Sequence, residues 1–150
     1  MKFVKISALI LLVALVGIQF VPTKRNQSNT VPKTDFMLVN NVPGAVQNKL
    51  QVSCYDCHSN NTQYPWYNKL QPIAWLMEDH ITKGKEELNF NEWGELSNRR
   101  KNSKLRSIIS QIEDNEMPMD SYTLIHRDAK LSENEKTEII KYMSQLKNSL

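Results

Sequence analysis

The pattern of apolar and polar positions divides the chain into an apolar N-terminal stretch, a polar connector and an amphipathic remainder. A nearly unbroken apolar run extends from Ala8 to Ile18 and continues to Val21, and Lys2 and Lys5 precede it. A basic start followed by an apolar run is the form of an export signal. The apolar residues would occupy every face of a helix, so a core helix with a single buried stripe is the weaker interpretation.

Two fates of this segment are compatible with the sequence. A cleaved signal needs two small residues around one spacer position, and no good site of that kind follows the apolar run. Residues 3–21 number 19, which gives about 28 Å as a helix, close to the ~30 Å apolar thickness of a bilayer. We therefore expect 1–21 to be a signal-anchor that crosses the membrane once, with a cleaved signal as the alternative.

Polar residues dominate 22–41, a segment rich in Asn, Thr, Ser, Pro and Lys. This composition is typical of a connecting segment. The whole chain of 150 residues is enough for one domain but hardly two. We expect 22–41 to be a tether that leaves the membrane and 42–150 to form the folded domain.

Helical spacing of apolar residues recurs through this domain. The predicted helices are 43–53, which begins at a proline, 72–83, which Gly84 ends, one that holds Leu105 to Ile112, and a last one that holds Ile139 to Leu150. Ser132 and Glu135 have the spacing of a capping box before that last helix, and 89–93 look like a cap and a helix start. Since no alternating strand pattern of any length is present, the predicted fold class is all-α.

Composition and charge remove several classes of protein. Hydrophobic residues make up 40% and charged residues 23%, which are ordinary values for a globular chain. Nineteen basic against 16 acidic side chains give a net charge of +3. That excess is too small to indicate nucleic-acid binding, and no motif for it is present. Two cysteines also exclude a disulfide-stapled scaffold.

The stretch Cys54-Tyr55-Asp56-Cys57-His58 has the form C-x-x-C-H, the attachment sequence of c-type haem. Two thiols three positions apart on a helical turn can reach the two vinyl groups at one edge of the porphyrin. The imidazole that follows can bind iron through one ring nitrogen while a carbonyl holds the other. We predict one covalent haem c, attached at Cys54 and Cys57, with His58 as an iron ligand.

Two other uses of the cysteine pair are weaker alternatives. A redox dithiol is typical of a strand-helix-strand pattern, and none surrounds this pair. A zinc site would need a second cysteine pair, whereas the chain has 2 Cys in all. Because covalent haem attachment in bacteria follows export, the export signal agrees with the haem motif. We expect the domain to lie in the periplasm, attached to the cytoplasmic membrane through the N-terminal helix.

The sixth iron ligand has five candidates, which are Met77, His80, Met117, Met119 and His126. Met117 precedes a proline, which favours extended geometry and lets its side chain project from a loop between two predicted helices. A thioether is a soft ligand that favours reduced iron. We favour Met117, with His80 as the main competitor because two-histidine ligation is common in c-type proteins. Met119, His126 and an open site are the further alternatives.

Residues outside the motif give the chain a resemblance to a known family. They are Ser59-Asn60, Tyr64-Pro65-Trp66-Tyr67, Pro72, Trp75-Leu76, Gly84, Leu88-Asn89-Phe90, Trp93, Met117-Pro118, Tyr122 and Leu131-Ser132. With the motif, they resemble the small haem-binding domain proteins of Bacteroidetes-type bacteria over nearly all of the chain after residue 40. The stretch 117–146 is also similar to the end of a monohaem cytochrome c.

This resemblance implies a small cytochrome c-like helical domain around one covalent haem c, anchored in the periplasm. Carried over onto this sequence, it implies Cys54 and Cys57 as thioether sites, His58 as the proximal ligand and Met117 as the distal one. One departure is that the family commonly has a second Pro after Met-Pro, where this chain has Met119.

The function expected from these features is electron transfer by a membrane-anchored cytochrome that is not an enzyme. Its partners would be the membrane and a redox protein, and the donor and acceptor stay open. A haem enzyme or sensor with a labile sixth site is one alternative, and a haem-bearing subunit of a larger membrane complex is another. The basic run 99–106 is expected to be a solvated helix face, with a docking patch or a haem propionate contact as its functional interpretation.

Overall fold

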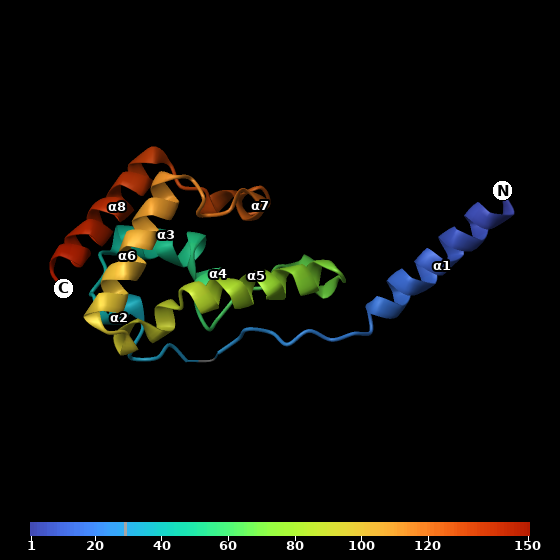
Figure 1. The fold of residues 1–150 in the computed structure, drawn as a ribbon, viewed down its shortest axis with the longest axis horizontal. Coiled ribbons are helices and arrows are strands. Elements are labelled where there is room, and N and C mark those ends of the chain that lie inside the picture. The colour runs from blue at the N-terminus through green and yellow to red at the C-terminus, as the bar shows by residue number, and fades with distance from the viewer. Residues whose placement is uncertain (29) are drawn as a thin grey trace.

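Three long helices frame the domain in the computed structural model of the chain, which describes residues 1–28 and 30–150. They are α5 (Ile73–Glu87), α6 (Asn98–Glu113) and α8 (Glu133–Asn148). Figure 1 shows α6 and α8 side by side, with α3 (Gly44–Ser53) crossing behind α6 and α5 extending away from the lower end of α6. Every regular element of the described residues is helical, so the all-α prediction is confirmed.

Short helical turns connect these helices and carry most of the chemistry. They are α2 (Phe36–Val39), α4 (Tyr55–His58), η1 (Trp66–Lys69), η2 (Phe90–Glu95), α7 (Asp120–Thr123) and η3 (Arg127–Ala129). The predicted cap at 89–93 is confirmed in η2, because the side chain of Asn89 accepts a hydrogen bond from the Asn91 N–H.

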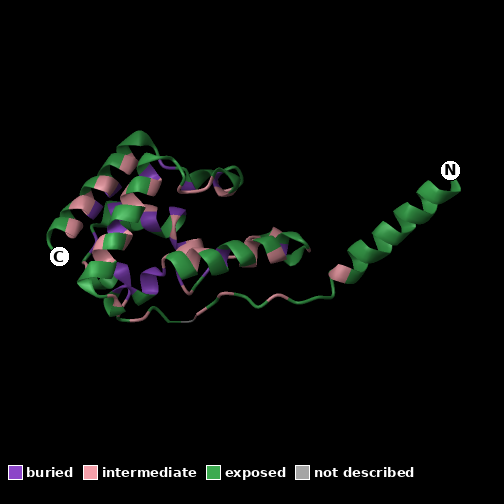
Figure 2. Ribbon diagram, in the orientation of Figure 1, coloured by how far each residue is buried: buried purple, intermediate pink, exposed green. Residues whose placement is uncertain are grey.

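The core lies where α2, α3, η2, α6 and α8 meet, and Figure 2 shows its buried residues gathered there. Phe36 and Trp93 are fully buried and meet edge to face with ring centroids 4.9 Å apart. Such an aromatic pair contributes roughly 0.5–1.5 kcal/mol beyond the area it buries. Leu50 of α3 and Leu105 of α6 are also fully buried. One contiguous core therefore holds α3, which leads into the C-x-x-C-H motif, against α6.

The C-terminal part of the segment 22–41, which was expected to be a tether, packs against the domain at residues 34–40. Asp35 caps α2 by accepting a hydrogen bond from the Met37 N–H at 2.9 Å, and Phe36 enters the core. Thr34 O accepts a hydrogen bond from the Gly94 N–H at 2.7 Å. Asp35 before an apolar run at 36–39 is the local sequence signal for this capped turn, and the polar composition around it obscures that signal.

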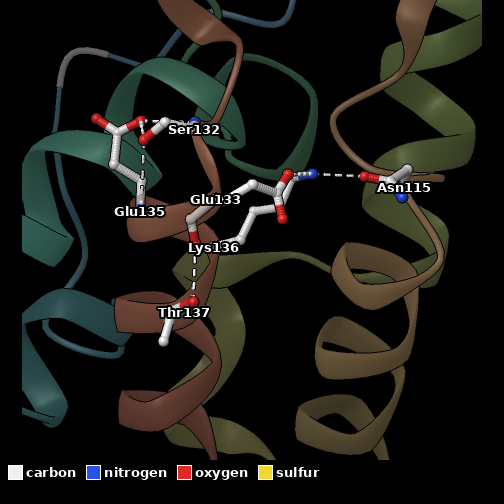
Figure 3. Close-up of polar contacts among 6 residues, drawn as sticks. All are labelled: Asn115, Ser132, Glu133, Glu135, Lys136 and Thr137. Carbon is white, nitrogen blue, oxygen red and sulfur yellow. Dashed lines mark hydrogen bonds and ion pairs between the residues drawn. The ribbon is translucent and has the colours of Figure 1, made fainter.

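Two of the predicted helix starts agree with the structure, and one predicted helix end does not. Helix α3 begins after Pro43, and α8 begins with the predicted capping box of Ser132 and Glu135 (Figure 3). The prediction that Gly84 ends its helix is wrong, because α5 continues through it to Glu87. The reason is a close helix contact at Gly84, described with the site below.

The N-terminal helix α1 (Lys2–Ile18) has no buried residue and leads away from the domain (Figures 1 and 2). It ends at Ile18 rather than at the expected Val21. Across residues 1–28 and 30–150, no helix combines the length and the apolar character needed to cross a membrane.

Candidate functional site

The C-x-x-C-H motif folds as one helical turn directly after α3. Cys54 ends α3 and begins α4, and its carbonyl accepts hydrogen bonds from the Cys57 N–H at 3.2 Å and the His58 N–H at 3.0 Å. Both thiols are free. The turn therefore brings two thiols and one imidazole together, as the spacing predicts.

Tyr55, the second residue of the motif, fixes this turn to the core. Its ring stacks on Phe90 with centroids 5.0 Å apart and planes 5° from parallel. Its hydroxyl donates to the carboxylate of Asp35 at 3.1 Å, and Asn91 Nδ2 donates to the same carboxylate at 2.8 Å. Since Asp35 is buried, these donors satisfy a carboxylate that burial would otherwise destabilise.

The imidazole of His58 is oriented by two backbone carbonyls. Its Nδ1 lies 2.8 Å from the oxygen of Gly84 and 2.9 Å from the oxygen of Leu88. Because a carbonyl oxygen can only accept, Nδ1 must carry the proton, and Nε2 then keeps its lone pair. Burial lowers the pKa of His58, which favours the neutral ring. A neutral imidazole held at Nδ1 is the form that binds a metal ion.

Gly84 allows α5 to approach the motif this closely. A Cβ at this position would lie 2.9 Å from the carbonyl oxygen of Cys57, inside any ordinary contact distance. The glycine therefore serves close packing in the middle of a helix, at the expense of helix propensity. The sequence contains the residue but gives no signal for this contact, since a glycine after an apolar stripe equally well predicts a helix end.

The surroundings of the two thiols disfavour their thiolate forms. Burial raises the pKa of Cys54 to about 12 and that of Cys57 to about 11, and neighbouring negative charge adds to both shifts. Redox dithiols instead have a cysteine whose pKa is depressed. The environment of this pair is therefore opposite to the one that a redox dithiol needs.

Two cavities adjoin both Cys54 and His58, one of about 310 Å³ and one of about 250 Å³. Five residues line both of them, namely Ser53, Cys54, His58, Glu87 and Met117. The larger cavity continues along α6, and the smaller one continues past Cys57 toward α7. A thiol, the imidazole and a thioether thus face the same space, although 59 positions separate His58 and Met117 (117 − 58).

The other candidates for the sixth ligand occupy different positions. Met119 and His80 line the smaller cavity but not the larger one, and His80 is exposed. Met77 lines neither, and contacts only a third cavity of about 180 Å³. His126 also lines this third cavity, where its Nε2 lies 2.6 Å from the Tyr67 hydroxyl.

Lys104 lies at the site, although it belongs to the basic run 99–106, which is predicted to be a solvated helix face. Arg99, Arg100 and Arg106 are exposed, as expected for a solvated face. Lys104 is instead half-buried at the larger cavity, and its Nζ donates to the carbonyl of Glu87. Ser107, one helical turn further along α6, lines the same cavity, and the sequence alone gives no signal that sets Lys104 apart from the charges around it.

Tyr122 is a second site residue that sequence reasoning did not assign. Its hydroxyl donates to Asp56 Oδ2 at 2.8 Å, and its ring lines the smaller cavity together with Cys57 and Met119. It also stacks on His126 with ring centroids 4.4 Å apart. The loop that carries Met117 and Met119 is thereby connected to the motif through α7.

Comparison with known proteins gives one match. A family model described as a haem-binding domain matches residues 13–145, a range that includes the motif, both cavities and Met117. Searches of curated proteins and of solved structures give no match.

Proposed function

Because the chain belongs to the haem-binding domain family, we propose that it is a c-type cytochrome that transfers electrons outside the cytoplasm. The observation that carries the proposal is the imidazole of His58, whose Nδ1 is held between two carbonyls while its Nε2 is left to bind iron. Two thiols on the same turn provide for covalent attachment.

The residues at the site fit one haem c. Cys54 and Cys57 would form the thioether bonds, His58 would bind the iron on one side, and Met117 would bind it on the other. When bound, the haem supplies one-electron chemistry between ferric and ferrous iron. All four side chains line the smaller cavity, and Cys54, His58 and Met117 also line the larger one.

Lys104 would balance the negative charge of the haem carboxylates. It is the cation that lines the larger cavity, and the Glu87 carbonyl holds its ammonium group there. A cation at this position also favours the reduced state, in which the haem carries one positive charge fewer.

Electron transfer is better supported than catalysis because Met117 shares both cavities with His58 and can complete the coordination. A haem enzyme needs an open coordination site and a nearby group that exchanges protons. His126, one candidate for that role, bonds to Tyr67 and stacks on Tyr122.

A location outside the cytoplasm is supported by α1, which is apolar and has no buried residue. Export would bring the cysteines to the compartment in which haem c is attached, and α1 would either remain in the lipid or be removed as a signal. Fractionation of cells into cytoplasm, membrane and periplasm tests this part, and recovery in the cytoplasm would contradict it.

Covalent attachment is tested with the full chain, made in a host that matures c-type cytochromes. We expect the denatured protein to keep its colour and to have the polypeptide mass plus one haem. The variant Cys54→Ala/Cys57→Ala should have the bare polypeptide mass, whereas Ser53→Ala should keep the haem. A colourless wild-type chain of bare polypeptide mass would overturn the proposal.

A further inference from the structure

Six large apolar side chains are exposed at the end of the domain where α5 begins. They come from η1 and the loop after it, from the first turns of α5, and from the end of α7, and they are Trp66, Leu70, Ile73, Leu76, Leu124 and Ile125. Trp66 and Leu124 are each 76% exposed. Tyr67, Ile73, Leu76 and Ile125 line one cavity, which joins α5 to α7. We refer to the six exposed residues as the apolar end patch.

Exposed apolar surface of this extent needs an explanation. Scattered single hydrophobic residues are normal on a protein surface, whereas a contiguous group marks a protein or membrane contact. Ile73, Leu76 and Ile125 line that cavity, and the other three patch residues adjoin it: Trp66 packs on Tyr67 with ring centroids 5.8 Å apart, Leu124 directly precedes Ile125, and Leu70 lies in the loop between Tyr67 and Ile73. Leu38, Val39 and Val52 are also exposed, but they belong to α2 and α3, which supply none of the lining. The apolar end patch therefore calls for a specific occupant.

The patch is connected directly to α1. Gln19 Nε2 donates to the carbonyl of Gln71 at 3.1 Å, and the Gln71 N–H donates back to Gln19 Oε1 at 3.0 Å. Gln71 Nε2 also donates to the carbonyl of Val21 at 3.1 Å. Gln71 lies between Leu70 and Ile73 of the patch, so the end of α1 is fixed beside it. Figure 1 shows α1 leading away from this end of the domain.

The chemistry of both surfaces favours lipid as the occupant. No residue of α1 is buried, and Phe3 is 85% exposed, so the helix and the patch form two neighbouring apolar surfaces that one apolar phase can cover. Tryptophan prefers the boundary between lipid and water, where Trp66 would lie. Lys24 and Arg25 follow α1 in sequence, and Lys69 lies between Trp66 and Leu70 of the patch. Such cations suit anionic headgroups.

We propose that the apolar end patch rests on the lipid surface that receives α1, so that the haem domain contacts the membrane through one fixed face. The proposal rests on the first of the two fates given above for α1, in which α1 remains in the lipid. Cys57 lines the cavity formed by Ile73, Leu76 and Ile125, so this edge of the motif turns toward the lipid. A redox partner that exchanges electrons at this edge must then reach it at the membrane surface.

The test uses hydroxyl-radical labelling of the full, haem-loaded chain bound to vesicles of phosphatidylethanolamine and phosphatidylglycerol. Labelling of each residue, read by mass spectrometry, is corrected for its reactivity in the unfolded chain. We expect Trp66 and Leu124 to be labelled several-fold less than Leu38, although all three are exposed in the protein alone. Equal labelling of the three residues on vesicles would overturn the proposal and favour a protein as the occupant.

Substitutions separate lipid contact from other causes of protection. The variant Trp66→Glu/Leu124→Glu should stay bound to the vesicles through α1 but lose the protection of Ile125, and the matched variant Leu38→Glu should keep it. Protection of the patch without vesicles would mean that α1 or a second copy covers it, which also overturns the proposal. A chain that carries covalent haem but does not bind vesicles would refute both the membrane location and this inference, and would leave the haem assignment intact.

Discussion

At the scale of single residues, three side chains of the site differ in the proton or charge that they place there. Two carbonyls place the proton of His58 on Nδ1, and Lys104 places one positive charge at the larger cavity. Met117 places a thioether, which carries no charge, in the same cavity. Since each of these groups has a different effect on iron, each can be removed and measured by itself.

Replacement of Met117 by Ala removes the proposed distal ligand. We expect the ferric protein to lose the weak far-red band between sulfur and iron, and the ferrous protein to bind carbon monoxide rapidly. Met119→Ala is the matched control, because Met119 lines only the smaller of the two shared cavities, and its spectrum should be unchanged. A far-red band that survives in Met117→Ala would show that another residue is the ligand.

Lys104→Gln removes the cation at the larger cavity with little change in shape. The midpoint potential should fall, because the ammonium charge favours reduced iron. A tenfold change in the redox equilibrium corresponds to about 59 mV for one electron, and we expect a fall of that order or less. Lys83→Gln is the control and should leave the midpoint potential nearly unchanged. Lys83 lines the smaller cavity, but its charge is balanced by Asp79 at 2.7 Å. Equal potentials in wild type and Lys104→Gln would refute the charge argument.

Whole elements determine how rigidly those residues are held. Helix α5 supplies the carbonyl that orients His58, and Gly84 lets it lie against α4. Helix α8 covers the core from the other side, and its first turn is fixed by Ser132 and Glu135 (Figure 3). Helix packing and helix capping therefore contribute to the site from residues that do not touch it.

Gly84→Ala should destabilise the protein although alanine is the better helix former. Overpacking costs about 1–3 kcal/mol, whereas the gain in helix propensity is at most about 1 kcal/mol. We expect a lower free energy of unfolding in urea and weakened ligation by His58, visible in the haem spectrum. Gly44→Ala is the control, since nothing lies within 4 Å of a Cβ there. Equal losses in both variants would refute the contact argument.

Ser132→Ala should lower the free energy of unfolding by about 1 kcal/mol, the usual contribution of an N-cap. The hydroxyl accepts a hydrogen bond from the Glu135 N–H, and the Glu135 carboxylate accepts one from the Ser132 N–H at 2.8 Å. Ser103→Ala, at an exposed position inside α6, should change the stability little. A loss of similar size in Ser103→Ala would show that the effect is not one of capping.

The same turn makes stability depend on pH. Hydrogen bonds from Lys49 and then from Ser132 lower the pKa of Glu135 from 4.5 to about 2. The unfolded chain therefore takes up the proton first as the pH falls, and the contribution of this carboxylate is present above pH 4.5 and lost toward pH 2. The stability difference between wild type and Glu135→Gln should narrow through this window in urea titrations. A difference that is constant with pH would contradict this.

For the molecule as a whole, the core is completed by parts of the chain that are far apart in sequence. Phe36 enters it from the segment 22–41, and the Tyr142 hydroxyl on α8 donates to the carbonyl of Asn40 at 3.3 Å across 102 positions. Stability is therefore a property of the domain with this segment included.

Phe36→Ala tests whether the segment 22–41 is part of the fold. Removal of a fully buried phenylalanine costs about 3–5 kcal/mol, which is a large part of the stability of a domain of this size. Leu38→Ala, in the same short helix but 56% exposed, should have little effect. A chain that unfolds at the same urea concentration in both variants would restore the interpretation of this segment as a tether.

Much of this architecture can be predicted from the sequence, and the remainder depends on contacts between distant residues. Periodicity and capping predict α3, α6 and α8, and C-x-x-C-H predicts the turn that carries the cysteines. The role of Gly84 could not be predicted, because it depends on how closely α5 approaches Cys57. The position of Lys104 at the cavity could not be predicted either, because the run of charges around it is typical of a solvated face.

Contact between α8 and the segment 22–41 also determines when the domain can complete its fold. Because a chain is made from its N-terminus, the helical turn with both cysteines exists well before Tyr142 can reach Asn40. During that interval the core is incomplete, since Ile139 and Met143 of α8 are fully buried members of it. Arrival of the last helix therefore completes the core, and a chain that stops short of α8 would leave Phe36 and Leu105 without part of their packing.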